Sequence, residues 1–234
     1  MRVLSKVVAS AILAFATALS AAPITWQSPT AIISAEVALF APGSIDYAVA
    51  WTGNGGRTVT LADNSVVNFQ NGAVNGTGAV QVQGAYGICP STCAGYNGTS
   101  NANFNSALSG FAFDGTQTVT LTGLTIGRTY TVQIFSLDYR GGVDNRLQFW
   151  NNGMGNQTAS YRHDAGVFVL GTFVANALTQ NLYGSTPNYG GNCSGARCTN
   201  LNAVVLRSVP EPAALGLLGL GLAGLAVRRR RRNA

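Results

Sequence analysis

The stretch TVTLTGLTIGRTYTVQIFSLDYR, residues 118–140, decides the fold of this chain. Apolar side chains alternate with polar ones in 118–121 and again in 129–135, so each segment would bury one face as a β-strand. Between them, residues 124–127 carry the composition of a turn. The stretch therefore predicts two antiparallel strands joined by a turn.

Working outward, similar short apolar runs recur between Gly- and Asn-rich turns. In residues 45–51 the large side chains fall at every second position, which places Trp51 in the core. About ten short strands separated by turn signals predict an all-β body, a two-sheet antiparallel β-sandwich. The other predicted strands are 58–61, 65–69, 79–82, 107–113, 146–150, 167–174, 179–183 and 201–207.

Two Gly- and Asn-rich segments, 84–105 and 184–200, lose the alternation and are predicted to be long surface loops. They carry all four cysteines. An even number of cysteines in an exported chain indicates disulfides, and we expect two local bridges, Cys89–Cys93 and Cys193–Cys198. The alternative, a zinc site, would need spacings of the C-x-x-C type, which these pairs lack.

The net charge of +6 does not belong to the body of the protein. Residues 23–209 contain seven Arg, seven Asp or Glu and no Lys, so their formal charges cancel. The excess comes from the two ends of the chain. A basic surface for nucleic acid is therefore not expected.

The N-terminus has the pattern of a secretory signal peptide. Arg2 and Lys6 precede an apolar run, 7–19, which ends in the small residues 20–22. We expect residues 1–22 to form a signal helix that directs the chain to the Sec translocon, and residues 23–208 to form one extracellular domain.

The C-terminal segment, 209–234, has three parts in order. Pro210, Glu211 and Pro212 disfavour a helix and predict an extended strip. The uncharged run 213–227 predicts a short transmembrane helix. The stop-transfer cluster that follows would keep its end in the cytoplasm by the positive-inside rule, and it consists of Arg228, Arg229, Arg230, Arg231 and Arg232.

These three parts resemble the PEP-CTERM sorting signal of Gram-negative bacteria. The resemblance implies that an exosortase-type membrane transpeptidase removes the tail. It also implies a route in which the body is first anchored at the inner membrane on the periplasmic side. The body then passes to the cell surface or the exopolysaccharide matrix.

The phrase L-x-G-L-x-x-G-x-x-Y-x-V-Q, residues 121–133, together with the strand predicted at 201–207, resembles the jelly-roll domains of such exported proteins. These look like galactose-binding carbohydrate modules. The resemblance implies a jelly-roll-like sandwich, and it bears on the fold more than on sugar binding, because the matching residues are mostly structural.

The residues that catalysis would need are sparse, so no enzymatic activity is expected. His163 is the only histidine, which excludes a site with two histidine ligands, and no nucleophile motif accompanies it. No cofactor is expected either. Asp138 and Asp144 flank a Gly-Gly turn and would be the ligands of a Ca²⁺ ion, although carboxylates so placed more often pair with Arg140 and Arg146.

Exposed aromatic rings that stack on sugars, with polar neighbours for the hydroxyl groups, would give the body weak polysaccharide binding. If Leu147 and Phe149 face the core, Trp150 points outward. The expected function is structural or adhesive, and the alternative is a secreted glycan-active enzyme. The candidate binding residues are Trp150, Tyr139, Arg140, Asp144 and Arg146, with Tyr161, Tyr183 and Tyr189 as further aromatic candidates.

Overall fold

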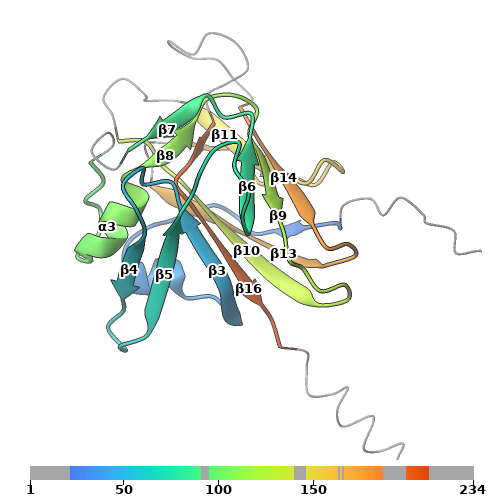
Figure 1. Ribbon diagram of the computed structural model, residues 1–234, viewed down its shortest axis with the longest axis horizontal. Coiled ribbons are helices and arrows are strands. Elements are labelled where there is room, and N and C mark those ends of the chain that lie inside the picture. Colours follow the sequence, from blue (N-terminus) through green and yellow to red (C-terminus); the bar gives the residue numbers. More distant parts are fainter. Residues whose placement is uncertain are drawn as a thin grey trace, which may run out of the picture.

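β-strands dominate the part of the chain that the structure describes, residues 22–90, 95–139, 146–162, 164, 166–186 and 199–210 of a computed structural model (Figure 1). The largest sheet has eight strands, ordered β1-β13-β10-β16-β3-β5-β4, with β2 also paired to β13. Their bounds are β1 Thr25–Trp26, β2 Thr30–Ala31, β3 Ser44–Ala50, β4 Arg57–Thr60, β5 Val66–Asn71, β10 Thr129–Ser136, β13 Val167–Val174 and β16 Ala203–Ser208.

Two smaller sheets and two short helices complete the described part. The five-stranded sheet has the order β12-β11-β14-β9-β6, and the three-stranded sheet has the order β15-β8-β7. The bounds are β6 Val80–Gln83, β7 Gly87–Cys89, β8 Phe111–Phe113, β9 Thr118–Leu121, β11 Leu147–Asn151, β12 Tyr161–Arg162, β14 Gln180–Ser185, β15 Asn200–Leu201, α1 Ala35–Leu39 and α3 Ala102–Leu108.

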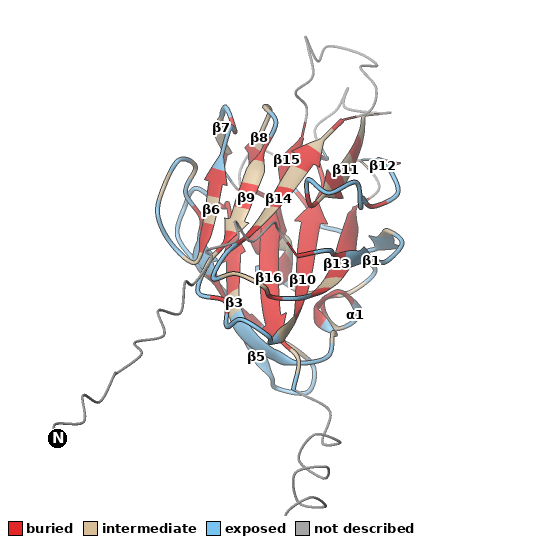
Figure 2. Cartoon of the chain, turned by 90° about the vertical axis from the view of Figure 1, so that its right-hand side faces the viewer, coloured by how far each residue is buried: buried red, intermediate tan, exposed pale blue. Residues whose placement is uncertain are grey.

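The eight-stranded sheet lies between two apolar layers. On one face, Val132 and Val204 pack in a cluster with Val119 and Leu182 of the five-stranded sheet. Strand β16 is buried along its whole length and β10 is buried from Tyr130 onward, as Figure 2 shows. Strands covered on both faces read as nearly continuous apolar runs, which explains the sequence of β16.

The opposite face of the same sheet is covered by the two helices. Phe135 of β10 and Val205 of β16 belong to a second cluster that includes Phe104 of α3 and Leu39 of α1. The rings of Phe104 and Phe135 meet edge to face, with centroids 5.8 Å apart. The helices therefore shield a sheet face that would otherwise be exposed apolar surface.

The predicted all-β body with antiparallel sheets is confirmed, although the described strands form three sheets where two were predicted, and β3 and β5 run parallel. Residues 118–140 were predicted to form two strands that pair with each other. Both strands are present, but they do not pair with each other. Strand β9 pairs with β14 and β6, whereas β10 pairs with β13 and β16. The turn after β9 therefore carries the chain from one sheet to the other. The jelly-roll topology stays a prediction.

The predicted loop 84–105 and strand 107–113 are wrong in part, because α3 spans the boundary between them. Asn101 caps this helix, with its side chain accepting a hydrogen bond from the Phe104 N–H at 3.0 Å. Phe104, Ala107 and Leu108 are buried at helical spacing. A segment of seven residues is too short for its apolar pattern to distinguish a helix from a strand by sequence alone.

The predicted signal helix (all but Ala22) and the predicted transmembrane helix 213–227 lie outside the described residues. Within the described part of the chain, no helix is both long enough and apolar enough to cross a membrane.

One buried amide joins the layers. The Asn202 Oδ1 accepts a hydrogen bond from the Leu137 N–H at 2.7 Å, and its Nδ2 donates to the Leu108 carbonyl at 2.7 Å and the Gly110 carbonyl at 3.2 Å. Its backbone pairs with Phe135 and Trp51. Asn202 therefore connects α3, the ends of β3 and β10, and the chain entering β16.

Replacing this amide with a methyl group should strongly destabilise the fold. Asn202→Ala leaves one buried N–H and two buried carbonyls without partners, and each orphaned group costs about 1–3 kcal/mol. We expect the free energy of unfolding to fall by at least about 3 kcal/mol, measured by urea denaturation. Asn68→Ala, which removes an exposed bond to Thr58, is the control. Equal losses in the two variants would contradict the role of Asn202.

Candidate functional site

The predicted sugar-stacking residue Trp150 is not on the surface. Its side chain is fully buried, and its Nε1 donates to Ser136 Oγ at 3.3 Å. Strand β11 turns Gln148 and Trp150 inward and leaves Leu147 and Phe149 half-buried. The prediction that Trp150 points outward is therefore wrong, because the larger ring occupies the space between the sheets.

A chain of buried hydrogen bonds explains why polar residues accompany Trp150 into the core. Gln148 Nε2 donates to the Tyr161 hydroxyl at 2.7 Å, and Gln148 Oε1 accepts from the Asn200 N–H at 2.9 Å. The Asn200 Nδ2 in turn donates to Asp138 Oδ2 at 3.0 Å. Tyr161 and Asp138 therefore have structural partners inside the body.

Of the remaining predicted sugar-binding residues, Tyr139, Arg146 and Tyr183 are described. Tyr139 is 43% exposed, and its ring lies 5.1 Å from that of the buried Tyr96. Burial, with the Asp164 carboxylate as a smaller cause, raises the pKa of Tyr139. Arg146 and Tyr183 are half-buried. Arg140, Asp144 and Tyr189 lie outside the described residues.

Of the two predicted calcium ligands, the structure describes Asp138. Asp138 is buried, while Asp144 lies outside the described residues, as does His163. Among the residues that are described, no group of three or more His, Cys, Asp or Glu side chains could hold a metal ion. Calcium binding stays a prediction.

Of the four cysteines, only Cys89 is described. It is buried at the end of β7 and is not a free thiol. Cys93, Cys193 and Cys198 lie outside the described residues, so the two local pairings stay predictions.

The place where the C-terminal segment leaves the body is well defined. Strand β16 ends at Ser208, the Val209 N–H donates to the Thr129 carbonyl at 2.9 Å, and Pro210 is exposed. Gly43 fits against this exit with φ +102, where an added Cβ would lie 2.5 Å from the Ser208 carbonyl oxygen. Only glycine suits both the angle and the close approach, so the exit is fixed by backbone packing.

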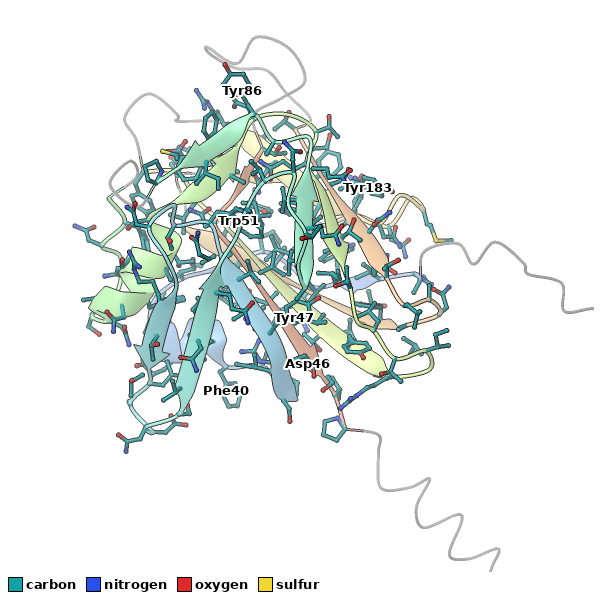
Figure 3. The ribbon with its side chains drawn as sticks, in the orientation of Figure 1. Phe40, Asp46, Tyr47, Trp51, Tyr86 and Tyr183 are labelled. Atoms are coloured by element: carbon teal, nitrogen blue, oxygen red, sulfur yellow. The ribbon has the colours of Figure 1, made fainter. Side chains whose placement is uncertain are left out.

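A cavity of about 340 Å³ opens beside the exit, with a mostly apolar wall that includes Leu39, Phe40, Ile45 and Val66. Phe40 is 83% exposed at its rim. Figure 3 shows Phe40 at the lower end of the body and Tyr86 at the opposite end. Because residues 31–40 read as an ambiguous apolar run, sequence reasoning did not find this cavity.

Arg207 reaches the same cavity from β16 but serves the fold. Its Nη2 donates to the Leu39 carbonyl at 2.6 Å and its Nη1 to Gln133 Oε1 at 3.2 Å, while Gln133 Nε2 donates to the Ala38 carbonyl. Together they satisfy carbonyls at the C-terminal end of α1. Burial lowers the pKa of Arg207 to about 10.

The segment that follows this exit is the part of the chain that matches a known family model. Residues 208–232 match the family model of the PEP-CTERM protein-sorting motif. This chain carries a PEP-CTERM sorting signal. The signal implies export, a membrane-associated C-terminus and processing by an exosortase, a membrane enzyme. Among curated proteins and solved structures, nothing matches the chain.

Of the predicted sorting residues, Pro210 is exposed at the end of β16, as an accessible strip requires. Glu211, Pro212 and the cluster Arg228–Arg232 lie outside the described residues. The galactose-binding-like character of the body stays a prediction.

Burial of Tyr161 should make stability fall at alkaline pH. The pKa of tyrosine is near 10 in an unfolded chain, and burial raises the pKa of Tyr161 to about 12. The folded state therefore holds the proton more tightly. The contribution of Tyr161 to the free energy of unfolding is complete below about pH 10 and is lost as the pH rises to about 12. Over this range the free energy of unfolding falls by up to about 1.4 kcal/mol per pH unit.

Urea unfolding at several alkaline pH values measures this effect. The slope should be smaller in Tyr161→Phe than in the wild type, whereas Tyr86→Phe, at an exposed ring, should keep the wild-type slope. Identical slopes in all three proteins would show that Tyr161 does not titrate as expected.

Proposed function

We propose that the body is a non-enzymatic structural or adhesive module, displayed at the cell surface or in the exopolysaccharide matrix after its C-terminal tail is removed. The observation that carries the proposal is the sorting motif at 208–232, which begins at the last residue of β16. Export is implied by the motif. The adhesive role and the route through the periplasm to the surface belong to the proposal.

The position of the exit supports removal of the tail without loss of the fold. Strand β16 is an inner strand, paired with β10 on one side and β3 on the other. The sorting motif continues from its end, and Pro210 is already outside the sheet. Cleavage beyond Pro210 would therefore leave every described strand intact.

The hydrogen bonds of the buried polar side chains also support a structural role. Asn202, Gln148 and Asn200 hold buried backbone groups or each other, and Arg207 holds the end of α1. Such fully bonded buried groups favour one rigid arrangement. Rigidity is what a displayed module needs.

Mass spectrometry of the released protein tests the sorting step. We expect the mature protein to end upstream of Arg228–Arg232. Glu211→Ala should keep the full C-terminal mass and stay with the membrane fraction, because the recognised Pro-Glu-Pro strip is changed. Glu36→Ala, on the body, should be processed like the wild type. A released wild-type protein that still carries the arginine cluster would contradict the proposal.

Retention of the processed protein on immobilised polysaccharides tests the adhesive part. Tyr139 is the most exposed of the predicted stacking rings that the structure describes. If it binds sugar, Tyr139→Ala should weaken binding roughly five-fold, equivalent to about 1 kcal/mol. Tyr86→Ala is the matched control.

If the wild type is retained on no polysaccharide, sugar binding is excluded and a purely structural role remains. Release of shortened glycans from the immobilised polysaccharides would instead favour the glycan-active enzyme.

A further inference from the structure

Exposed apolar side chains are gathered at one end of the body. The described residues have eleven large hydrophobic side chains that are exposed. Six of them lie at the end where the chain leaves for the sorting signal. They are Phe40, Ile45, Val66, Ile126, Val174 and Leu178, and we call this set the exit face.

Strand register places these residues at the same end. Ser208 of β16 lies opposite Ser44 of β3 and Tyr130 of β10, and Thr129 lies opposite Val174. The parallel pairing of β3 and β5 brings the start of β5 to this end as well. The strand ends that carry these side chains therefore lie at the same end of the body as the end of β16 (Figure 1).

The exit of the chain lies between two parts of this face. Phe40, Ile45 and Val66 line the cavity on one side. On the other side, Ile126 and Arg128 line a shallow depression together with Pro210. The loop after β13, with Leu178, adjoins Ile126 through a bond of 2.7 Å from the Gly127 N–H to the Ala175 carbonyl.

The sequence leaves little distance between this face and the membrane. Val209 is still bonded to β10, and the apolar run begins at Ala213, three residues after Pro210. An extended chain spans about 3.3–3.6 Å per residue, so the end of the body stands within roughly 10 Å of the apolar run. That length is comparable to the depth at which interfacial side chains insert.

We propose that the exit face rests on the surface of the lipid bilayer that holds the C-terminal segment, with Phe40 and Ile126 inserted among the lipid headgroups. The inference rests on the membrane association of the sorting signal. Removal of exposed apolar side chains from water drives the contact, and Phe is typical of protein segments that lie at the headgroup boundary. The bilayer thus covers an apolar surface that an isolated body would leave in water.

The charges near this face indicate which lipids it accepts. The carboxylates at this end are Glu36, Asp46 and Asp63. Arg128 is at the same end, and its side chain is exposed. The three carboxylates outnumber the two cations at this end, Arg128 and the buried Arg207, and the excess negative charge opposes an anionic surface. The face therefore suits zwitterionic lipid, and anionic lipid should weaken its contact.

Fluorescence quenching by brominated phosphatidylcholine tests the proposal on the full-length chain in phosphatidylcholine vesicles. Phe40→Trp places a reporter in the exit face, and Ile126→Trp is a second, independent reporter. Tyr86→Trp is the matched control, because Tyr86 is 84% exposed but lies at the opposite end (Figure 3). The unchanged chain gives the background, which comes from the fully buried Trp51 and Trp150 and from the partly buried Trp26.

We expect Phe40→Trp and Ile126→Trp to lose most of their added emission, Tyr86→Trp to lose none, and the loss to shrink when anionic lipid is included. Vesicle flotation distinguishes the bilayer contact of the exit face from the membrane association of the sorting signal. A chain that floats while both exit-face reporters stay unquenched overturns the bilayer contact alone and leaves the face to a protein partner. A chain that does not float contradicts the membrane-held signal, and the contact with it.

Discussion

The arrangement of the layers depends on the buried side chain of Asn202. Its amide holds the backbone leaving α3 and the backbone leaving β10, while its own peptide groups bond to β10 and to the residue after β3. Because Asn202 is fully buried, losing any of these bonds would leave a buried polar group without a partner, so the amide fixes how the helix layer and the sheet meet. These contacts fix the position of β16, the strand that follows, and the sorting segment begins at the end of this strand.

Alternation predicted most strands because apolar burial on a sheet follows the pleat of the backbone. Strand β13 lies at the predicted residues, and Trp51 is buried as expected. Pairing was harder to predict. The turn between β9 and β10 looks like a hairpin, but its backbone bonds to the loop after β13, so it crosses between sheets. Partners so distant in sequence leave no local signal.

The candidate site shows the same limit. Trp150 and Phe149 are both large and apolar, so alternation alone cannot say which face of β11 is inside. The buried partners Ser136 and Asn200 decide it, and both come from other strands. The sorting motif, in contrast, was predictable because its recognition depends on a short, contiguous order of residues. The exit face combines six side chains from strands and loops that are distant in sequence, so only the folded structure reveals it.

The pairing of β16 also determines how the body responds to tension. A load applied at the C-terminal attachment point pulls along β16, and the hydrogen bonds to β10 and β3 lie across that direction. The bonds on both sides are then sheared together, whereas an edge strand such as β4 could be peeled away one bond at a time. A module tethered through this strand would therefore resist drag from flowing liquid with its whole central sheet.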